Sequence, residues 1–328
     1  MSMIVQAITA DIYQVRLPLP FALRYVNCYL LAGEAGWTVV DTGLNTADGR
    51  ETWHMALAEL GIQFSDIEQI VLTHAHPDHY GLAGWLQQEA QGLPSVLMSP
   101  RERELAHWVW QEEAGWTEAV TSFWRQCGIP DEVVTAVVTE TDRTRQRTRP
   151  HPQTIQTIEP DTIIKLGNRQ FQIIHTPGHS DGQIIFYDAA ERLLLCGDHV
   201  LQRITPNISL WPFGEPDPLG RYLHSLSQIA QLDVNLALPG HGPLIDDLRG
   251  RIRELQTHHA ERLGVMATAV NGAATPYTIS QRVFDFDKLS IHEKRFAVSE
   301  TLAHLEYLVW QKRIQKSSQP TGWLYSSQ

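Results

Sequence analysis

Short apolar or alternating runs, separated by turn residues, dominate the chain from about residue 4 to residue 100. Such runs predict strands, because successive side chains of a strand point to opposite faces of a sheet. Two intervening stretches, Thr46–Leu60 and Leu82–Ala90, instead carry the spacing of a helix. The alternation of the two patterns predicts an α/β layering. The expected strands are Val26–Ala32, Trp37–Val40, Gln69–Thr73 and Val96–Met98.

The pattern changes between Arg101 and about Asp142, where apolar residues recur at helical intervals. This spacing predicts a helical insertion over residues 101–150. Tryptophans at such intervals either pack the insertion onto the body or form a wall of a substrate pocket, and packing is the favoured interpretation. The insertion carries four of the ten tryptophans of the chain, namely Trp108, Trp110, Trp116 and Trp124.

A second set of strands follows, and each of its runs is closed by Gly, Pro or Asp. Beyond residue 243 the spacing becomes helical. These changes predict one domain over residues 1–245, a mostly helical C-terminal module over 246–315 and a tail over 316–328. The tail contains Ser, Gln, Gly and Pro with little periodicity, which predicts partial disorder. The expected strands of the second set are Thr162–Leu166, Phe171–His175, Gln183–Tyr187, Leu193–Cys196 and Leu236–Leu238.

Composition and charge narrow the classes of protein. Hydrophobic residues make up 43% of the chain and charged residues 19%, as in an ordinary soluble globular protein. The net charge of −11 repels polyanions, so nucleic acid is not the first partner to expect. Cys28, Cys127 and Cys196 are odd in number and far apart, which favours free thiols and a cytoplasmic location. The N-terminus lacks a signal-peptide pattern and no apolar stretch reaches membrane-spanning length, so we expect neither export nor insertion.

The densest group of potential metal ligands comes directly after an apolar strand run. Histidine nitrogens and carboxylate oxygens are ligands that zinc and iron accept, and four such groups on one tight loop can serve two metal ions. A lone histidine is usually structural, but no structural role requires this density. The sequence therefore predicts a metal site. Its residues are His74, His76, Asp78 and His79.

Three later ligand-type residues, His179, Asp198 and His241, share this context, just after a strand run and beside glycine. Each is a weak signal alone, because Pro-Gly-His and Gly-Asp are common turn sequences. Strand ends converge on one edge of a layered α/β fold. As a set, the three residues would complete two coordination spheres.

The ordered series His-x-His-x-Asp-His, His, Asp, His resembles the metallo-β-lactamase fold superfamily of binuclear metallohydrolases. The resemblance covers about residues 10–245 apart from the insertion, and Asp41-Thr42-Gly43 resembles an early strand-end motif of the superfamily. It implies a four-layer αβ/βα sandwich in which Asp41 supports the metal site from behind the ligands.

The resemblance also implies two divalent metal ions, with zinc expected and iron or manganese as alternatives. A hydroxide shared by the two ions would attack a carbonyl or phosphoryl group, and Asp78 or Asp198 would take or orient the proton. The implied ligands are His74, His76 and His179 for one ion, Asp78, His79 and His241 for the other, and Asp198 as the bridge.

Particular branches of the superfamily resemble the chain more than others. Aspartate at position 198 is similar to the glyoxalase II, lactonase and RNase Z branches, whereas zinc β-lactamases usually have a cysteine or another non-bridging residue there. His76 stands where the flavodiiron redox branch usually has glutamate, which disfavours that branch. Thr257–Leu263 and Ser299–Leu308 resemble the winged-helix-like extension of the branch that contains the lactamase-beta-like endoribonucleases.

Several neighbours of the motifs have two possible roles. His175 and His199 lie close enough in sequence to the expected ligands to support them. The Tyr80 hydroxyl could contact substrate, but packing beside the loop is the favoured role. Cys196 lies in a strongly apolar run, which favours a buried structural thiol over a catalytic one.

These observations do not identify the substrate. Alternating arginines at positions 143, 145, 147 and 149 would place four guanidiniums on one face of an extended segment and grip phosphates, but a solvated loop is the favoured interpretation. Three hypotheses remain, in order of preference. The first is a hydrolase of a small ester, thioester or lactone with the tryptophan-rich insertion as a lid. The second is a phosphodiesterase or endoribonuclease acting on single-stranded RNA, and the third is a non-catalytic binding protein.

Overall fold

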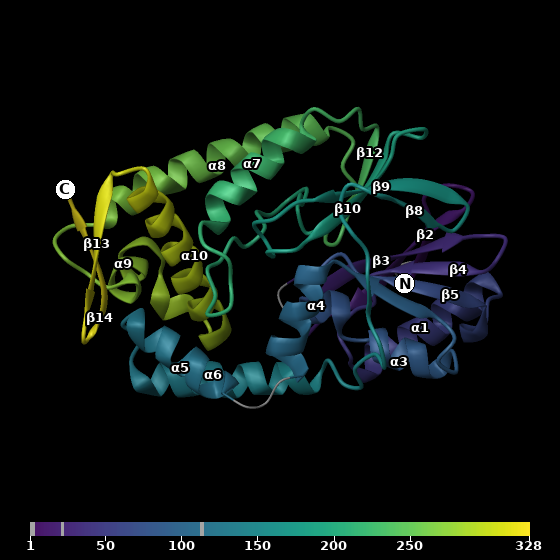
Figure 1. Ribbon diagram of the computed structural model, residues 1–328, viewed down its shortest axis with the longest axis horizontal. Coiled ribbons are helices and arrows are strands. Elements are labelled where there is room, and N and C mark those ends of the chain that lie inside the picture. Colours follow the sequence, from purple (N-terminus) through teal and green to yellow (C-terminus); the bar gives the residue numbers. More distant parts are fainter. Residues whose placement is uncertain (1–3, 21–22, 112–114) are drawn as a thin grey trace.

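The computed structural model describes residues 4–20, 23–111 and 115–328. The first three residues of the N-terminal segment considered above therefore lie outside the described residues. Figure 1 shows two large sheets on one side of the molecule and the C-terminal helices and hairpin on the other. The insertion and two long helices connect the two sides.

The first sheet has the strand order β1-β2-β3-β4-β5-β6-β7. Strands β1 to β4 pair antiparallel, and β4 to β7 pair parallel. Parallel neighbours need a crossover, which α1 (Ala47–Leu60) supplies between β4 and β5 and α3 (Ala83–Glu89) between β5 and β6. The strands are β1 (Val5–Ala7), β2 (Ile12–Pro18), β3 (Tyr25–Ala32), β4 (Trp37–Val40), β5 (Ile67–Val71), β6 (Ser95–Met98) and β7 (Gln156–Thr157).

The second sheet has the strand order β12-β11-β10-β9-β8. Its strands pair antiparallel except for the parallel pair β11 and β12, which the crossover helix α7 (Pro218–Ile229) joins. Asp217 caps this helix by accepting a hydrogen bond from the Gly220 N–H. The strands are β8 (Ile163–Leu166), β9 (Arg169–His175), β10 (Ile184–Asp188), β11 (Leu193–Gly197) and β12 (Leu236–Pro239).

The two sheets pack face to face through one apolar core. Leu31 of the first sheet and Phe186 of the second are both buried in it. Helices α1 and α3 cover the outer face of the first sheet through Trp53 and Leu86. On the outer face of the second sheet lie α7, through Leu226, and the start of α8 (Leu248–Ala269). The predicted four-layer α/β sandwich is confirmed.

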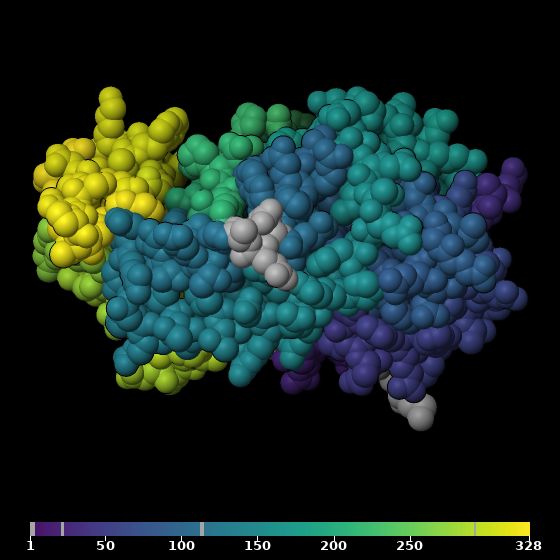
Figure 2. Space-filling model, turned by 60° about the horizontal axis from the view of Figure 1, so that its bottom comes forward, coloured from purple at the N-terminus to yellow at the C-terminus, as the bar shows by residue number. Residues whose placement is uncertain are grey.

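The predicted helical insertion is confirmed as well. It comprises α4 (Pro100–Ala106), the π-helix η2 (His107–Gln111), α5 (Trp116–Gln126) and α6 (Asp131–Gln146). Figure 2 shows the blue insertion lying between the body and the yellow C-terminal module. Trp110, Trp116 and Trp124 are buried, whereas Trp108 keeps 38% of its surface exposed. Packing is therefore the role of three of the four tryptophans.

We expect the change Trp124→Ala to lower the free energy of unfolding by about 3–5 kcal/mol, because the lost ring leaves a cavity in a close-packed core. Trp124 is fully buried, and its ring centroid lies 5.1 Å from that of Phe123 and 5.9 Å from that of Trp211. Urea unfolding followed by circular dichroism measures the change. Trp108→Ala is the control, with an expected loss below about 1 kcal/mol. Equal losses in the two variants would contradict the packing role.

The arginine alternation does not form an extended cationic face. Helix α6 continues to Gln146 and ends on Arg147, so the segment is helical and then turns instead of forming a strand. Arg145 is buried against the ring of Trp116, with its guanidinium 4.8 Å from the ring centroid. Arg143 pairs with Glu140 at 3.2 Å. The extended face is therefore wrong, because the period of two crosses the end of a helix. The interpretation as a solvated loop holds only for Arg147 and Arg149, which follow that helix.

The C-terminal module is mostly helical, as predicted. It contains α8, α9 (Pro276–Val283), the short η3 (Phe286–Lys288) and α10 (Ile291–Trp310). The body adds η1 (Phe64–Asp66) and α2 (Pro77–Tyr80). Among the described residues, none of these helices is both long and apolar enough to cross a bilayer.

The expectation of a partly disordered tail was wrong. The segment forms a hairpin of β13 (Ile314–Gln319) and β14 (Gly322–Ser327) that packs on α10. Tyr325 is buried and its hydroxyl donates to Glu306 of α10, which also pairs with Lys316 at 2.6 Å. These contacts with a distant helix order a polar segment whose composition alone indicates flexibility.

Candidate metal centre

The ligand-type residues lie at strand ends. His74 and His76 occupy the loop after β5, and Asp78 and His79 lie in α2, which Pro77 begins. A proline in the first turn suits this start, because the first helical N–H has no helical partner. The loops after β9, β11 and β12 carry the remaining three residues. The structure brings all seven side chains together: His74, His76, Asp78, His79, His179, Asp198 and His241.

Two groups of ligand atoms can be distinguished. The three-histidine group is His74, His76 and His179, and its ring nitrogens lie 3.0 Å (His74 Nε2 to His76 Nδ1) and 2.9 Å (His76 Nδ1 to His179 Nε2) apart. The aspartate–histidine group is Asp78, His79 and His241. Within each group the ligand atoms lie within 4.8 Å of one another, a spacing compatible with one shared cation.

Asp198 lies between the two groups. Its Oδ2 is 3.5 Å from His179 Nε2 of the three-histidine group and 3.3 Å from His241 Nε2 of the other. Its Oδ1 is 3.4 Å from His79 Nε2. One carboxylate is therefore placed to contact cations in both groups.

The donor atoms fit divalent cations. His79 Nε2, His241 Nε2 and Asp198 Oδ1 are buried and find no aligned hydrogen-bond partner among the described residues. In the three-histidine group, nitrogen faces nitrogen at hydrogen-bond distance. Such buried lone pairs are costly unless another atom satisfies them. A cation between them would satisfy them all, and imidazole with carboxylate is a donor set that zinc, iron and manganese accept.

The electrostatics of the two groups differ. Burial lowers the pKa of His76 to about 3 and also lowers the pKa of the other two histidines in its group, so these rings are neutral and offer lone pairs. Burial would likewise lower the pKa of His79 and His241, but the surrounding carboxylates together outweigh it. Asp198, Asp41 and Asp78 raise the pKa of His79, and Asp198 and Asp78 raise that of His241 to about 10. Burial would raise the pKa of Asp78 and Asp198, yet His79 and His241 hold both well below the ordinary value. The protons on His79 and His241 balance the negative charge that a cation would balance in their place.

Hydrogen bonds behind the ligands fix their orientation. The Asp41 carboxylate accepts from the Thr73 N–H and hydroxyl, both at 2.8 Å, and contacts His79 Nδ1 at 2.8 Å. His241 Nδ1 lies 2.7 Å from the Tyr25 carbonyl oxygen. Each such contact occupies Nδ1, so that in the neutral ring, once a cation has replaced the proton, Nε2 is the atom that faces the centre. Asp41 thus lies behind the ligand-type residue His79, as the resemblance implies.

We expect Asp41→Asn to weaken metal binding and turnover by about 10–100-fold, the usual effect of losing a partner behind a metal-ligating histidine. The amide nitrogen cannot accept from Thr73 or His79, so one of the three hydrogen bonds is lost whichever way the amide is turned. Competition with a chromophoric chelator measures the affinity. Asp48→Asn, at an exposed position in the first turn of α1, serves as the control. Equal metal affinity in both variants would show that Asp41 does not orient His79.

Sequence reasoning missed Glu102. Its carboxylate accepts hydrogen bonds from the Ala75 N–H (2.6 Å), the Ser180 hydroxyl (2.6 Å) and the Gly182 N–H (2.8 Å). Burial raises the pKa of Glu102 to about 7, although these three bonds favour the ionised form. No local pattern marks one glutamate in the first turn of a helix as different from its exposed neighbours.

The neighbouring residues take structural roles. His175 Nε2 bonds the Asp181 carbonyl oxygen at 2.9 Å and so supports the loop that carries His179. His199 is buried against Tyr222, with ring centroids 5.2 Å apart. Tyr80 is fully buried, and its hydroxyl accepts from Gln111 Nε2 at 3.1 Å, in keeping with packing beside the loop. Cys196 is buried, as expected.

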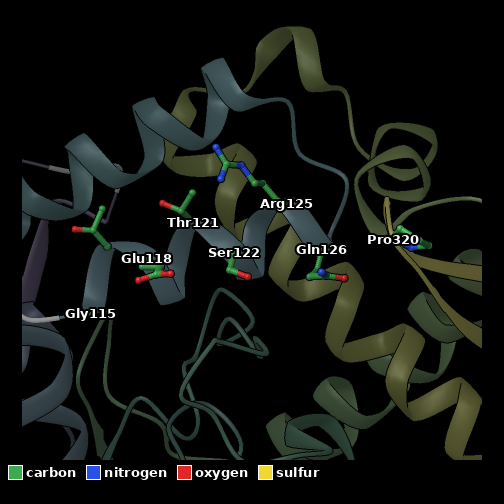
Figure 3. A pocket seen from close by; sticks show the side chains of 8 residues that line it. Gly115, Glu118, Thr121, Ser122, Arg125, Gln126 and Pro320 are labelled. Atoms are coloured by element: carbon green, nitrogen blue, oxygen red, sulfur yellow. The ribbon is translucent and has the colours of Figure 1, made fainter.

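A surface pocket of about 710 Å³ lies along α5 (Figure 3). Its lining comes from α5 with Gly115 and from Pro320 between β13 and β14, and none of these residues belongs to either ligand group. Glu118, Ser122 and Arg125 are exposed, as is usual for a solvated helix face and unlike the enclosed, mostly apolar lining of a ligand site.

Comparisons with known proteins agree with this geometry. Residues 22–241 match the model of the Metallo-beta-lactamase superfamily, and residues 263–325 match that of the Metallo-beta-lactamase-like, C-terminal domain. A probable metallo-hydrolase of Bacillus subtilis is 27% identical over 308 residues, which are 92% of this chain and 92% of that protein. A lactamase-like protein of Emericella nidulans is 24% identical over 245 residues, which are 74% of this chain but only 60% of that protein.

Solved structures extend the likeness to nearly the whole chain. A metallo-beta-lactamase family protein from Thermus thermophilus has a TM-score of 0.88 and 34% identity, and the match covers 98% of this chain and 100% of that one. A beta-lactamase domain protein from Burkholderia ambifaria has a TM-score of 0.87 and 26% identity, with 99% and 94% covered. The chain therefore belongs to the metallo-beta-lactamase superfamily and carries the metallo-beta-lactamase-like C-terminal domain after its sandwich fold.

Proposed function

We propose that this protein is a binuclear metal-dependent hydrolase that cleaves a small carboxylic ester, thioester or lactone. The observation that carries the proposal is the pair of ligand groups joined by Asp198, whose Oδ2 lies within 3.5 Å of a histidine from each group. The three-histidine group would hold one ion and the aspartate–histidine group the other. We propose zinc for both, because the donor set is rich in imidazole.

Two ions held by these residues would lower the pKa of a bound water toward neutrality and would polarise the bond to be cleaved. The side chains of this protein supply the rest of the mechanism. His79 and His241 hold the pKa values of Asp78 and Asp198 well below the ordinary value, so both carboxylates stay ionised near neutral pH and can accept a hydrogen bond that orients the attacking water. No serine or cysteine nucleophile is required, and burial raises the pKa of the Cys196 thiol well above its usual range.

Two aromatic side chains that Arg101 connects to the loop carrying His179 support a small, partly apolar substrate. Arg101 donates to Asp181 at 2.9 Å, two residues beyond His179, and to the Phe213 carbonyl oxygen at 2.7 Å. The ring of Phe213 lies 6.0 Å from that of Trp108, the half-exposed tryptophan of the insertion. Small-molecule sites are usually lined by aromatic and other apolar side chains with a few polar groups, and this pair could supply part of such a lining.

The charge of the protein also favours a small substrate over single-stranded RNA. A nuclease needs a basic groove that follows the phosphates. The arginines expected to supply it do not form one face, since Arg145 packs on Trp116 and Arg143 pairs with Glu140. The chain as a whole carries a net charge of −11.

The test is turnover of a panel by protein of known metal content, namely a thioester, a lactone, a bis-aryl phosphodiester and single-stranded RNA. We expect two metal ions per chain and turnover of the carbonyl substrates. Turnover of the phosphodiester and RNA alone would replace this proposal by a nuclease. Fully loaded protein that cleaves nothing in the panel would favour a binding protein.

A further inference from the structure

Glu102 joins the two loops that carry the three-histidine group. Its side chain is fully buried in the first turn of α4, at the start of the insertion. One carboxylate oxygen accepts from the N–H of Ala75, the residue between His74 and His76. The other accepts from the Ser180 hydroxyl and the Gly182 N–H, just beyond His179. One side chain thus bonds both loops.

Two further residues of the same region fasten the same loops. The Trp110 Nε1–H donates to the Ala75 carbonyl oxygen at 2.6 Å, so both backbone groups of Ala75 are held by the insertion. The Ser99 hydroxyl donates to the Gly182 carbonyl oxygen at 2.6 Å and accepts from the Glu102 N–H at 3.2 Å. Contacts from Ser99 to Trp110 therefore hold the backbone of both loops, while Thr73 and the Asn207 carbonyl oxygen orient the rings of His74 and His179.

The aspartate–histidine group depends on other parts of the chain. His79 is oriented by Asp41 at the end of β4, and His241 by the Tyr25 carbonyl oxygen at the start of β3. Asp41 reaches both groups, because it also holds Thr73, whose hydroxyl lies 2.9 Å from His74 Nδ1. Glu102, in contrast, bonds only the two loops of the three-histidine group.

We infer that Glu102 is a positioning residue that sets the affinity of the three-histidine site, and hence that the insertion builds half of the metal centre as well as covering it. This inference rests on the proposed binuclear centre. All three groups that face Glu102 are donors, so only a carboxylate accepts from all of them. In Glu102→Gln the amide nitrogen would face the N–H of Ala75 or of Gly182, so at least one of the hydrogen bonds that hold the two loops would be lost.

The experiment isolates the three-histidine site in the variant His241→Ala, which removes a ligand of the other group. Competition with a chromophoric chelator at pH 8 measures the zinc affinity of two proteins. One carries His241→Ala alone, and the other carries His241→Ala together with Glu102→Gln. We expect Glu102→Gln to weaken this site by about 10–100-fold. Glu104→Gln is the matched control, because Glu104 lies in the same helix with 54% of its side chain exposed and should leave the affinity unchanged.

The outcomes separate this inference from the proposed function. Wild-type protein that holds fewer than two zinc ions contradicts the binuclear centre itself. If wild type holds two ions and the Glu102 variant binds zinc as tightly as the control, the role of Glu102 is overturned. Circular dichroism shows whether each variant is folded. If Glu102→Gln does not fold, the zinc affinity of the variant Ser180→Ala tests the inference instead. Loss of that one hydrogen bond should weaken the site by about 2–10-fold, and an unchanged affinity would overturn the inference.

Discussion

Replacing Asp198 by alanine is expected to lower kcat/KM by at least about 10³-fold and to reduce the metal content below two ions per chain. The carboxylate lies within 3.5 Å of histidines from both ligand groups. His179 belongs to the three-histidine group, and His79 and His241 belong to the aspartate–histidine group. Loss of the carboxylate removes a ligand from each ion and the negative charge that holds them close. Metal-assisted charge stabilisation contributes several kcal/mol, and each 1.36 kcal/mol corresponds to a tenfold change in rate. Steady-state kinetics and elemental analysis of the same preparation measure both effects.

The control for Asp198 is an aspartate outside the centre. Asp233→Ala removes a side chain that is 67% exposed and pairs with Arg192, so turnover and metal content should stay as in wild type. Asp198→Ala protein that keeps two ions and full turnover would show that the carboxylate is not shared between them. Loss of turnover with both ions retained would leave Asp198 a role in proton transfer alone.

The fold could be predicted because its strands are short, apolar and clearly punctuated. The strand expected at Leu193–Cys196 is β11, in which every residue is buried, and a buried strand is readable as an unbroken apolar run. The strands β1 and β2 were not assigned, although the pattern was read from about residue 4. In β2 the polar residues Gln14 and Arg16 alternate with apolar Tyr13, Val15 and Leu17, so the sequence carries a strand signal there that the prediction did not use.

The ligands could be predicted from their density and their position after strand ends, whereas their division into two groups came only from the resemblance. Spacing places His74 and His76 on one loop, but it cannot say that His179, about a hundred residues later, joins them. The fold makes this contact, with His76 Nδ1 2.9 Å from His179 Nε2. Binding of metal by these residues stays a prediction that the experiments above test.

Three of the failures involve tertiary contacts between segments that are distant in sequence. The tail is polar, yet Tyr325 and Glu306 bring it onto α10 and order it. Arg145 looks like part of a cationic stripe, yet it packs on Trp116 of the preceding helix. Glu102 looks like any surface glutamate of a helix until the fold turns it toward Ala75. In each case local composition favoured solvent, and partners far away in sequence outweighed it.

Removal of metal by a strong chelator is expected to abolish turnover and to lower the melting temperature by roughly 5–10 °C. A site filled at a thousand times its Kd stabilises the folded state by about 4 kcal/mol, and a change of 1 kcal/mol shifts the melting temperature by a few degrees in a protein of this size. The buried carboxylates of Asp78 and Asp198 add to the effect, because without a cation only the protons on His79 and His241 balance their charge. Differential scanning calorimetry with parallel assays measures both changes.

Zinc should restore activity and melting temperature together, whereas magnesium should restore neither. Magnesium prefers oxygen ligands and retains its waters, and five of the seven ligand-type side chains of this centre are imidazoles. Restoration by magnesium would mean that the oxygen atoms of Asp78 and Asp198 dominate the centre. Chelated, metal-free protein with unchanged melting temperature and full turnover would remove the metal from the mechanism altogether.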